Sequence, residues 1–345
     1  MTNLPRRPTL TTFTAAELAI RQMPPARFVV PRFITEGLTL LGGRPKVGKS
    51  WLLMNIALAV ATGRNILGEK VAAPGDVLLL ALEDNERRLQ ARLNLMLAGE
   101  IAPSRLHLAT VCPALDQGGL AAIRDWCRRL DNPRLIIVDV FARVRPRAQS
   151  GARLYEADYD SALPLKSLAD ELELGIIACT HTRKEPAAVD PFDSISATTG
   201  LAGAADSILI LDRNSTGPTL YGRGRDMEEV EVALVFERNT GTWKLIGDAA
   251  DVNRSDERNA IIAILTAADQ PLSPKQIAER SGLGHASVKH LVRRLVTTGE
   301  ITKSARGTYS SAGAPVHLVH SIHSLSQRVT MVNGVNGTGT ATSSI

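Results

Sequence analysis

The stretch GGRPKVGKS at residues 42–50 decides the fold of this chain. Its last eight residues match the spacing G-x-x-x-x-G-K-[ST] of a phosphate-binding loop. The apolar run Leu38–Leu41 stands before it and predicts a buried strand, while the pattern of Trp51–Thr62 after it predicts a helix. A strand, a glycine-rich loop and a helix in this order form the context that the motif requires.

The residue types of this loop fit the binding of a nucleoside triphosphate. Glycines let backbone N–H groups close around phosphate oxygens, and the N-terminus of the following helix adds its partial positive charge. We expect Lys49 to reach the β- and γ-phosphates of ATP and Ser50 to hold Mg²⁺. A tight turn that binds nothing is the alternative interpretation. The residues expected to contact the nucleotide are Gly43, Arg44, Pro45, Lys46, Val47, Gly48, Lys49, Ser50 and Trp51.

The composition is that of a globular protein with a sizeable core. Of the 345 residues 44% are hydrophobic, and the length predicts one domain plus a smaller one. The longest apolar stretches fall far short of the roughly 18 residues that a membrane span needs, and the N-terminus lacks the apolar block of a signal peptide. Cys112, Cys127 and Cys179 do not pair at metal-binding spacing and predict reduced thiols. We therefore expect a cytoplasmic protein without membrane contact.

The charge of the chain is uneven along its length. Residues 254–345 hold 10 Lys and Arg against 5 Asp and Glu, which leaves 30 of each kind in residues 1–253. The net charge of +5 therefore lies entirely in the last quarter. A basic terminal module favours a polyanionic partner such as DNA, and a solvated basic face is the alternative.

Apolar strands alternate with helices through the front of the chain, which predicts an α/β fold with a mostly parallel sheet. From about residue 204, short strands joined by turns predict an antiparallel extension of that sheet. The strands are expected at residues 38–41, 76–82, 106–111, 134–139, 175–180, 207–211, 219–222, 230–236 and 242–246. The expected parts are an N-terminal lead-in over 1–36, the α/β domain over 37–247, a polar linker over 248–255, a small domain over 256–311 and a disordered tail over 312–345.

The small domain has the pattern of a winged helix-turn-helix. Helices are expected at residues 258–267, 274–281 and 285–298, followed by a hairpin at 299–309. The third helix would enter the major groove of duplex DNA, with Lys303 and Arg306 of the wing near phosphates. A domain that binds another protein is the alternative. The side chains of the third helix expected to face DNA are His285, Ser287, Lys289, His290, Arg293 and Arg294.

Two carboxylates at strand ends complete the predicted site. Asp139 ends an apolar strand, where a carboxylate beside the loop reaches Mg²⁺ directly or through water; a strand-end cap is the alternative. Many phosphate-loop ATPases carry a glutamate directly after this aspartate. Here the next residue is Val140, so another group must activate the attacking water. Glu83 ends the neighbouring strand at the same edge of the sheet and is the expected general base. Alternatively Glu83, Asp84 and Asn85 only cap the following helix, although Asp84 or Asn85 suits capping better.

Three further side chains are expected to act on the nucleotide. His181 follows the next strand, where it can bond the γ-phosphate and report its departure; an exposed strand-end histidine is the alternative. Arg223 and Arg225 lie two residues apart on a peripheral strand and point the same way. Their guanidinium groups suit the transition-state charge of phosphoryl transfer and would more easily reach a neighbouring subunit's nucleotide than their own. The alternative is a charged edge strand that blocks aggregation.

These motifs together resemble the RecA-like hexameric ATPases, and among them the RepA-type replicative helicases and related phage or plasmid ATPases. The resemblance covers about residues 28–246 and rests on the segments GLTLLGGRPKVGKSWL, LLLALEDN, RLIIVD, IACTHTRK and LYGRGRD. It implies that Glu83 is the catalytic base, that Asp139 and His181 are the family's strand-end aspartate and histidine, and that Arg223 or Arg225 is an arginine finger acting across a subunit boundary.

The resemblance also implies a homo-hexameric ring that ATP drives along single-stranded DNA. Channel loops of such rings track phosphates with basic side chains; solvated surface loops are the alternative. A RepA-type helicase need not carry a C-terminal winged helix. An ATP-dependent DNA-binding regulator or initiator without motor activity therefore stays open, as does a RecA/RadA-like recombination ATPase. The basic loop residues are Arg143, Arg145, Arg147 and Arg153 after Asp139, and Arg183 and Lys184 after His181.

Overall fold

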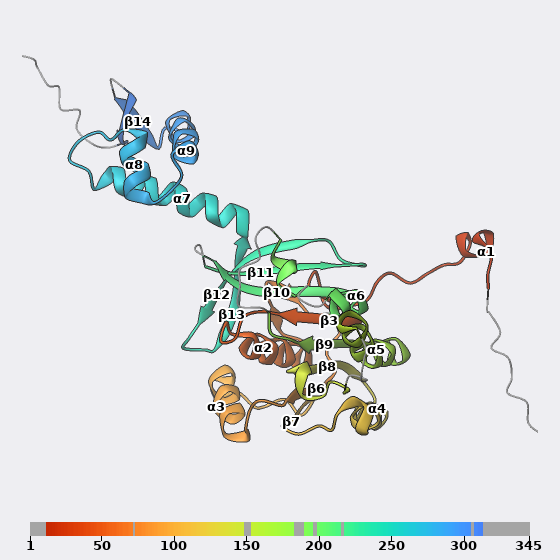
Figure 1. The fold of residues 1–345 in the computed structure, drawn as a ribbon. Coiled ribbons are helices and arrows are strands. Elements are labelled where there is room, and N and C mark those ends of the chain that lie inside the picture. The colour runs from red at the N-terminus through yellow and green to blue at the C-terminus, as the bar shows by residue number, and fades with distance from the viewer. Residues whose placement is uncertain are drawn as a thin grey trace, which may run out of the picture. The chain divides into compact units, whose positions relative to one another are not determined.

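The computed structural model describes residues 12–71, 73–147, 153–182, 190–195, 199–214, 217–304 and 307–312. Contacts within the chain divide it into two units, residues 1–256 and residues 257–345. The first unit is built on a nine-stranded sheet, and the second combines helices with a short hairpin (Figure 1).

The central sheet has the strand order β13-β12-β11-β10-β3-β9-β8-β6-β7. The strands from β7 to β3 and on to β10 run parallel, and β10 to β13 are antiparallel to one another. The α/β fold with a mostly parallel sheet and its antiparallel extension are thus confirmed. The strands are β3 (Gly37–Gly42), β6 (Asp76–Ala81), β7 (Leu106–Ala109), β8 (Pro133–Asp139), β9 (Gly175–Cys179), β10 (Ser207–Asn214), β11 (Gly217–Gly224), β12 (Val230–Glu237) and β13 (Thr242–Asp248).

Helices cover both faces of the parallel strands. Successive residues of a strand point to opposite faces, so Leu41 packs in the core beneath α2 and Leu40 in the core beneath α5. No helix in the described part of the chain is both long and apolar enough to span a bilayer. The helices α2 (Lys49–Thr62) and α3 (Glu86–Leu97) lie on one face, and α4 (Gly119–Arg128), α5 (Leu154–Leu172) and α6 (Thr199–Ala204) on the other.

Short elements complete the first unit. The lead-in contains α1 (Ala15–Ala19), none of whose residues is buried, and a small antiparallel pair of strands. A 3-10 turn follows β8 almost directly and carries Arg143, one of the predicted basic loop residues. These elements are β1 (Phe28–Val30), β2 (Ile34–Thr35), β4 (Asn65–Ile66), β5 (Glu69–Lys70), η1 (Leu115–Gln117), η2 (Phe141–Arg143) and η3 (Pro191–Ser194).

A buried asparagine joins α2 to the antiparallel end of the sheet. The Asn55 side chain accepts a hydrogen bond from the Trp243 backbone N–H at 2.7 Å and donates one to the Gly241 carbonyl at 3.1 Å. Asn55 is 6% exposed. Both hydrogen bonds join residues more than 180 positions apart, so the helix that follows the phosphate loop is fixed to the last strand of the sheet.

In its described part the second unit holds most of α7, two further helices and a two-stranded antiparallel hairpin, as the sequence predicts. The N-cap Ser273 forms a capping box with Gln276, with Pro274 at the first helical position. Residues 249–255, expected as an irregular linker, are helical instead, because this polar stretch contains no Gly or Pro to interrupt a helix. Residues 313–345 lie outside the described part. The elements are α7 (Ala249–Thr266), α8 (Pro274–Ser281), α9 (His285–Thr297), β14 (Ile301–Ser304) and β15 (Thr308–Ser311).

The substitution Asn55→Ala should lower the free energy of unfolding of the first unit by about 2–4 kcal/mol. It leaves the Trp243 N–H and the Gly241 carbonyl without their buried partner. Urea unfolding followed by tryptophan fluorescence measures this, because all three tryptophans lie in residues 1–256. The exposed Asn94→Ala on α3 is the control, expected within about 0.5 kcal/mol of the wild type. Equal effects of the two substitutions would contradict this role of Asn55.

Candidate nucleotide site

The phosphate loop connects β3 to α2 in the predicted order. Gly48 is the N-cap of α2 with φ of 112°, a left-handed conformation that glycine adopts without strain. A Cβ on Gly43 would lie 2.5 Å from the Leu211 carbonyl oxygen, so this position has no room for a side chain. Among the described residues no side chain caps α2, and its first N–H groups therefore remain available to a ligand.

The Lys49 ammonium lies inside the curve of the loop. Its Nζ donates to the carbonyl oxygens of Gly43 at 2.6 Å and Arg44 at 3.1 Å, and lies 3.2 Å from Nδ1 of His181. Lys49 is only 5% exposed. Burial lowers the pKa of Lys49, and the nearby carboxylates of Asp139 and Glu83 act in the opposite direction. These groups therefore surround one cation at the edge of the sheet.

Asp139 lies at the end of β8 and is 9% exposed. The strand register pairs Ala81 with Asp139 and Val138 with Ala178, which brings Asp139 next to Cys179 on the adjacent strand. Burial raises the pKa of the Cys179 thiol well above its usual range, and the neighbouring Asp139 carboxylate raises it further. Cys179 is thus a neutral thiol beside the predicted metal-binding carboxylate.

Glu83 and His181 face each other across the same edge. Glu83 Oε2 lies 3.8 Å from His181 Nε2, and both side chains are about half exposed. His181 thus stands between Lys49 on one ring nitrogen and Glu83 on the other. Four of the predicted residues, Lys49, Glu83, Asp139 and His181, come together at the carboxyl ends of neighbouring parallel strands, where ligands of open α/β sheets bind.

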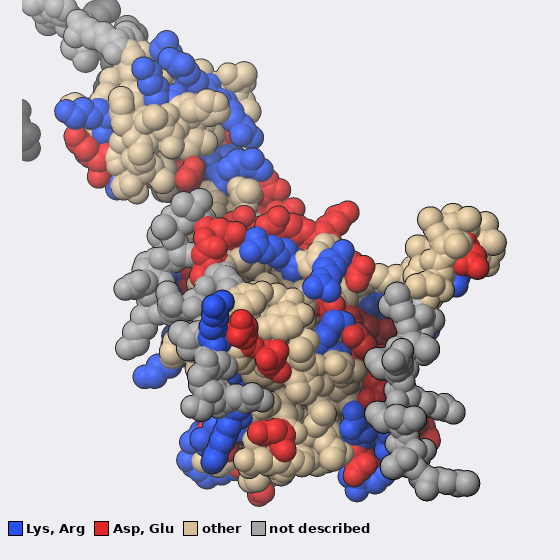
Figure 2. Space-filling view, turned by 45° about the vertical axis from the view of Figure 1, so that its right-hand side comes forward, with Lys and Arg blue, Asp and Glu red and all other residues tan. Residues whose placement is uncertain are grey.

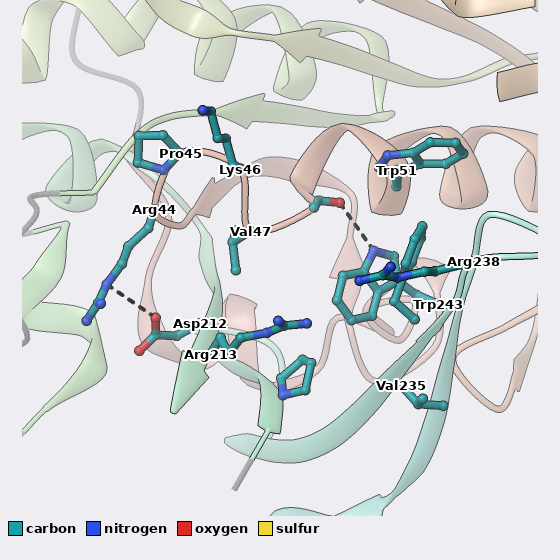
Figure 3. Close-up of a pocket in the computed structure, with 13 residues that line it drawn as sticks. Arg44, Pro45, Lys46, Val47, Trp51, Asp212, Arg213, Val235, Arg238 and Trp243 are labelled. Atoms are coloured by element: carbon teal, nitrogen blue, oxygen red, sulfur yellow. Dashed lines mark hydrogen bonds and ion pairs between the residues drawn. The ribbon is translucent and has the colours of Figure 1, made fainter. Parts of the chain in front are cut away.

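A cavity of about 610 Å³ lies between the phosphate loop and the antiparallel strands β10 to β13 (Figure 3). Figure 3 shows Arg213 of β10 pointing into it, while Lys46 points away. Arg44 pairs with Asp212 across 3.6 Å at its rim. Besides loop residues 44–48, the lining side chains include Trp51, Arg213, Val235, Phe236, Arg238 and Trp243.

Trp243 connects this cavity to the loop. Its Nε1–H donates to the Gly48 carbonyl at 3.2 Å, and a Cβ on Gly48 would lie 2.6 Å from Trp243 Cζ2. Trp51 and Trp243 each pack against Phe236, with ring centroids 5.5 and 5.1 Å apart. No motif predicts these residues of β10, β12 and β13 at the cavity, because they lie 160 or more positions beyond the loop. The only sequence signal is the presence of aromatic and arginine residues on short predicted strands.

Arg223 is held by contacts with η3 and its N-cap Asp190 in the same chain. Its Nη1 donates to Asp190 Oδ2 at 3.0 Å, and its guanidinium carbon lies 3.9 Å from the centroid of the Phe192 ring. The register pairs Arg223 with Ile208, whose neighbour Ile210 packs against Phe192 and Ile195. Arg223 therefore lies on the sheet face opposite to α2.

Arg225 lies just past the end of β11 and is well exposed. Its guanidinium is 3.8 Å from Asp206, whose carboxylate accepts a hydrogen bond from the Leu38 N–H at the start of β3. The phosphate loop lies at the other end of β3. Four residues of strand, about 13 Å, separate Leu38 from Gly42, so the position of Arg225 does not face the loop of the same chain.

The basic residues after Asp139 have different surroundings. Arg145 forms an ion pair with the buried Asp158, and the Arg143 Nε donates to the Leu82 carbonyl at 3.4 Å. Arg147 and Arg153 are exposed. Arg145 is therefore tied to α5 with a third of its side chain exposed, and Arg143, Arg147 and Arg153 are open to solvent. Arg183 and Lys184 of the second predicted loop lie outside the described residues.

The third helix of the C-terminal unit is amphipathic. Val288, Val292 and Leu295 are buried in the core of this unit. Basic side chains gather on the visible face of the unit (Figure 2). The exposed residues of α9 include all six predicted to face DNA: His285, Ser287, Lys289, His290, Arg293 and Arg294. Lys303 of the hairpin is also exposed, and Arg306 lies outside the described residues.

A P-loop ATPase fold with this site defines the class of the protein. Residues 4–187, more than half of the chain, match the AAA domain family AAA_25, and the chain belongs to this family. Residues 260–304 match the IclR helix-turn-helix domain. No curated protein matches the chain in sequence.

Solved structures with similar folds include a replicative helicase and a KaiC-like protein. A DnaB-like replicative helicase, described together with its interactions with primase, is 15% identical with a TM-score of 0.51. The match covers 67% of this chain and 66% of that one, just under two thirds of the helicase. The KaiC-like protein PH0186 of Pyrococcus horikoshii OT3 has 13% identity and a TM-score of 0.43, over 65% and 98% of the two chains.

Binding of ATP or a non-hydrolysable analogue should change the tryptophan emission. Trp51 and Trp243 line the cavity beside the loop, whereas Trp126 lies on α4 on the other face of the sheet. Titration with nucleotide should give a saturable change that Trp243→Phe reduces and Trp126→Phe retains. Lys49→Ala should move the titration to higher concentration. Unchanged emission at saturating nucleotide would contradict nucleotide binding in the cavity lined by Trp51 and Trp243.

Proposed function

We propose that this protein is an ATP-hydrolysing, ring-forming DNA-binding ATPase that works as a RepA-like replicative helicase. The observation that carries the proposal is the grouping of Lys49, Glu83, Asp139 and His181 around the phosphate loop. Membership of the AAA domain family supports the nucleotide-dependent part of the proposal. The similarity of the fold to that of a DnaB-like replicative helicase favours a motor.

The site fits a nucleoside triphosphate with Mg²⁺. Backbone crowding at Gly43 and the left-handed Gly48 leave a cradle of N–H groups, and the cavity beyond Trp243 offers aromatic and guanidinium surfaces for a base. Within the described residues no group of three or more His, Cys, Asp or Glu could hold a metal alone. Ser50 and Asp139 would hold Mg²⁺ together with phosphate oxygens, and the ion would neutralise phosphate charge.

The protein residues divide the work of hydrolysis. Glu83 is half exposed and free to accept the proton of an attacking water, as a general base requires. Lys49 exchanges its loop carbonyl partners for phosphate oxygens. His181, poised between Lys49 and Glu83, bonds the γ-phosphate and moves when that group leaves. Its movement would pass to the residues that follow it in the chain.

A ring of six copies accounts for the position of the two arginines. Arg223 lies on the sheet face opposite to α2 and is paired with Asp190, and Arg225 lies at the strand end opposite to the loop of the same chain. One of them can instead stabilise the charge that develops on the phosphates of a neighbouring copy's nucleotide during hydrolysis. Arg225 is 65% exposed and weakly paired, which makes it the more available of the two.

DNA binding is proposed at two places. The exposed arginines after Asp139 would follow a single strand through the ring. The basic face of α9 would meet duplex DNA, a role that the match to a helix-turn-helix domain favours. This separately folded terminal unit also favours the second candidate function, an ATP-dependent regulator or initiator without motor activity. A filament-forming recombination ATPase has no such observation in its favour.

Single-stranded DNA should stimulate ATP hydrolysis, and Glu83→Gln should lower kcat by about 100-fold or more, the size expected for loss of a general base. The control is Glu86→Gln, which removes an exposed carboxylate three positions along the chain. A steady-state phosphate-release assay with and without DNA measures both effects. Hydrolysis without DNA stimulation would favour the regulator, and full activity of Glu83→Gln would refute the assignment of the base.

Mixed rings should reveal a finger that acts across subunits. Arg225→Ala or Arg223→Ala subunits lack the finger, and Lys49→Ala subunits lack a working loop, so each alone should be inactive. Mixing the two kinds should restore part of the turnover, because a Lys49→Ala subunit can supply its arginine to a neighbour. Mixtures of Lys49→Ala with Glu83→Gln, whose defects lie in the same site, are the matched control without recovery. No recovery with either arginine variant would contradict action in trans.

Removal of Lys289 and Arg293 together should weaken duplex DNA binding across sequences. Each phosphate-binding side chain that is removed should make the plot of log K against log salt shallower by about 1. Fluorescence anisotropy at several salt concentrations measures this. The control is the double variant Lys70→Ala/Arg128→Ala, which removes two exposed charges from the first unit. Equal weakening in both double variants would mean that net charge, and not the α9 face, attracts DNA.

A further inference from the structure

The turn that carries Glu83 contains a second acidic residue with no role in the proposal above. Asn85, and not Asp84, is the N-cap of α3: its side chain accepts a hydrogen bond from the Arg88 backbone N–H at 2.9 Å. The Asp84 carboxylate is instead bound by two guanidinium groups. Arg88 Nε donates to its Oδ1 at 2.5 Å, and Arg92 pairs with Oδ2.

This cluster is more than a surface ion pair. The Asp84 side chain is 10% exposed and that of Arg92 is 22% exposed. Exposed ion pairs contribute little, because water screens them and the side chains lose freedom on pairing. A carboxylate largely removed from water needs its partners, so Asp84, Arg88 and Arg92 fix one another in place.

The backbone on each side of Glu83 is held by the same group of residues and by β8. Arg88 Nη2 donates to the Glu83 carbonyl at 3.1 Å. The Leu82 N–H donates to the Asp139 carbonyl at 2.7 Å. Glu83 therefore has a fixed main chain and a side chain that remains free to turn toward the nucleotide.

Besides its ion pair with Asp84, Arg92 contacts a residue next to the phosphate loop. Its guanidinium lies over the Trp51 ring, 5.3 Å from the centroid. Trp51 directly follows Ser50 on α2 and packs edge-on against Phe236. A chain of contacts thus joins the proposed general base to the helix that presents Lys49 and Ser50. It runs from the Glu83 main chain through the Asp84 ion pairs to Arg92 and Trp51.

We propose that Asp84 is a positioning residue for Glu83, and that Arg92 sets the distance between this carboxylate base and the phosphate loop through Trp51. The inference rests on the proposed function, in which Glu83 is the base. A displacement of about 1 Å at a reacting group can cost about 100-fold in rate, so a turn fixed to α2 has a direct catalytic consequence.

The test is a double-mutant cycle on ATP hydrolysis with Asp84→Asn and Glu83→Gln. Asp84→Asn should lower kcat by about tenfold or more and leave KM for ATP within about threefold, because binding is intact and only the base is misplaced. In the Glu83→Gln background the same change should alter the residual rate by less than about twofold. A merely structural role would lower both backgrounds equally.

Arg92→Gln is the second variant and breaks the cluster from the guanidinium side, so the cycle can be completed even where Asp84→Asn does not fold. The matched control Glu86→Gln should leave kcat unchanged. Equal reductions from Asp84→Asn with and without Glu83, a rise in KM that accounts for the reduction, or no reduction at all would overturn the inference. Full activity of Glu83→Gln would instead overturn the proposed function and the inference with it.

Discussion

The site depends on how the buried ammonium group of Lys49 is held. A charge taken out of water must be surrounded by partners, and the loop carbonyls of Gly43 and Arg44 supply them at the start of α2. Asp139, Glu83 and His181 lie around the same cation because they end or follow three adjacent parallel strands. Trp243 closes the loop from the other side through the Gly48 carbonyl, so the antiparallel end of the sheet becomes part of the nucleotide site.

The parallel sheet also separates two sets of candidate site residues. Its carboxyl edge carries the loop and the acidic residues, and Arg225 lies at the amino end of the strands, beside Asp206. Since a strand is rigid and several residues long, one chain does not bring both edges together. The proposed ring rests on this separation, because a neighbouring copy would supply the arginine.

Much of the fold follows from local signals. Parallel strands buried on both faces read as continuous apolar runs, so β3, β6, β8 and β9 are predictable within a residue or two. The loop, Asp139, Glu83 and His181 follow because strand ends of a parallel sheet share an edge. The predictions are wrong or undecided where no such signal exists. The polar start of α7 resembles a linker. Asp84 and Asn85 are equally good N-caps by sequence, and only the structure shows that two arginines of α3 bind Asp84.

The sequence by itself therefore determined the class of fold, the phosphate loop and the identity of the groups around it, because each is encoded by contiguous residues at fixed spacing. The tertiary structure alone decided which distant residues meet them. Asn55 and Trp243 contact each other from opposite ends of the domain, Arg223 is paired with Asp190 on the far face of the sheet, and Arg92 packs on Trp51. Such contacts depend on strand order and helix packing, which no short stretch of sequence encodes.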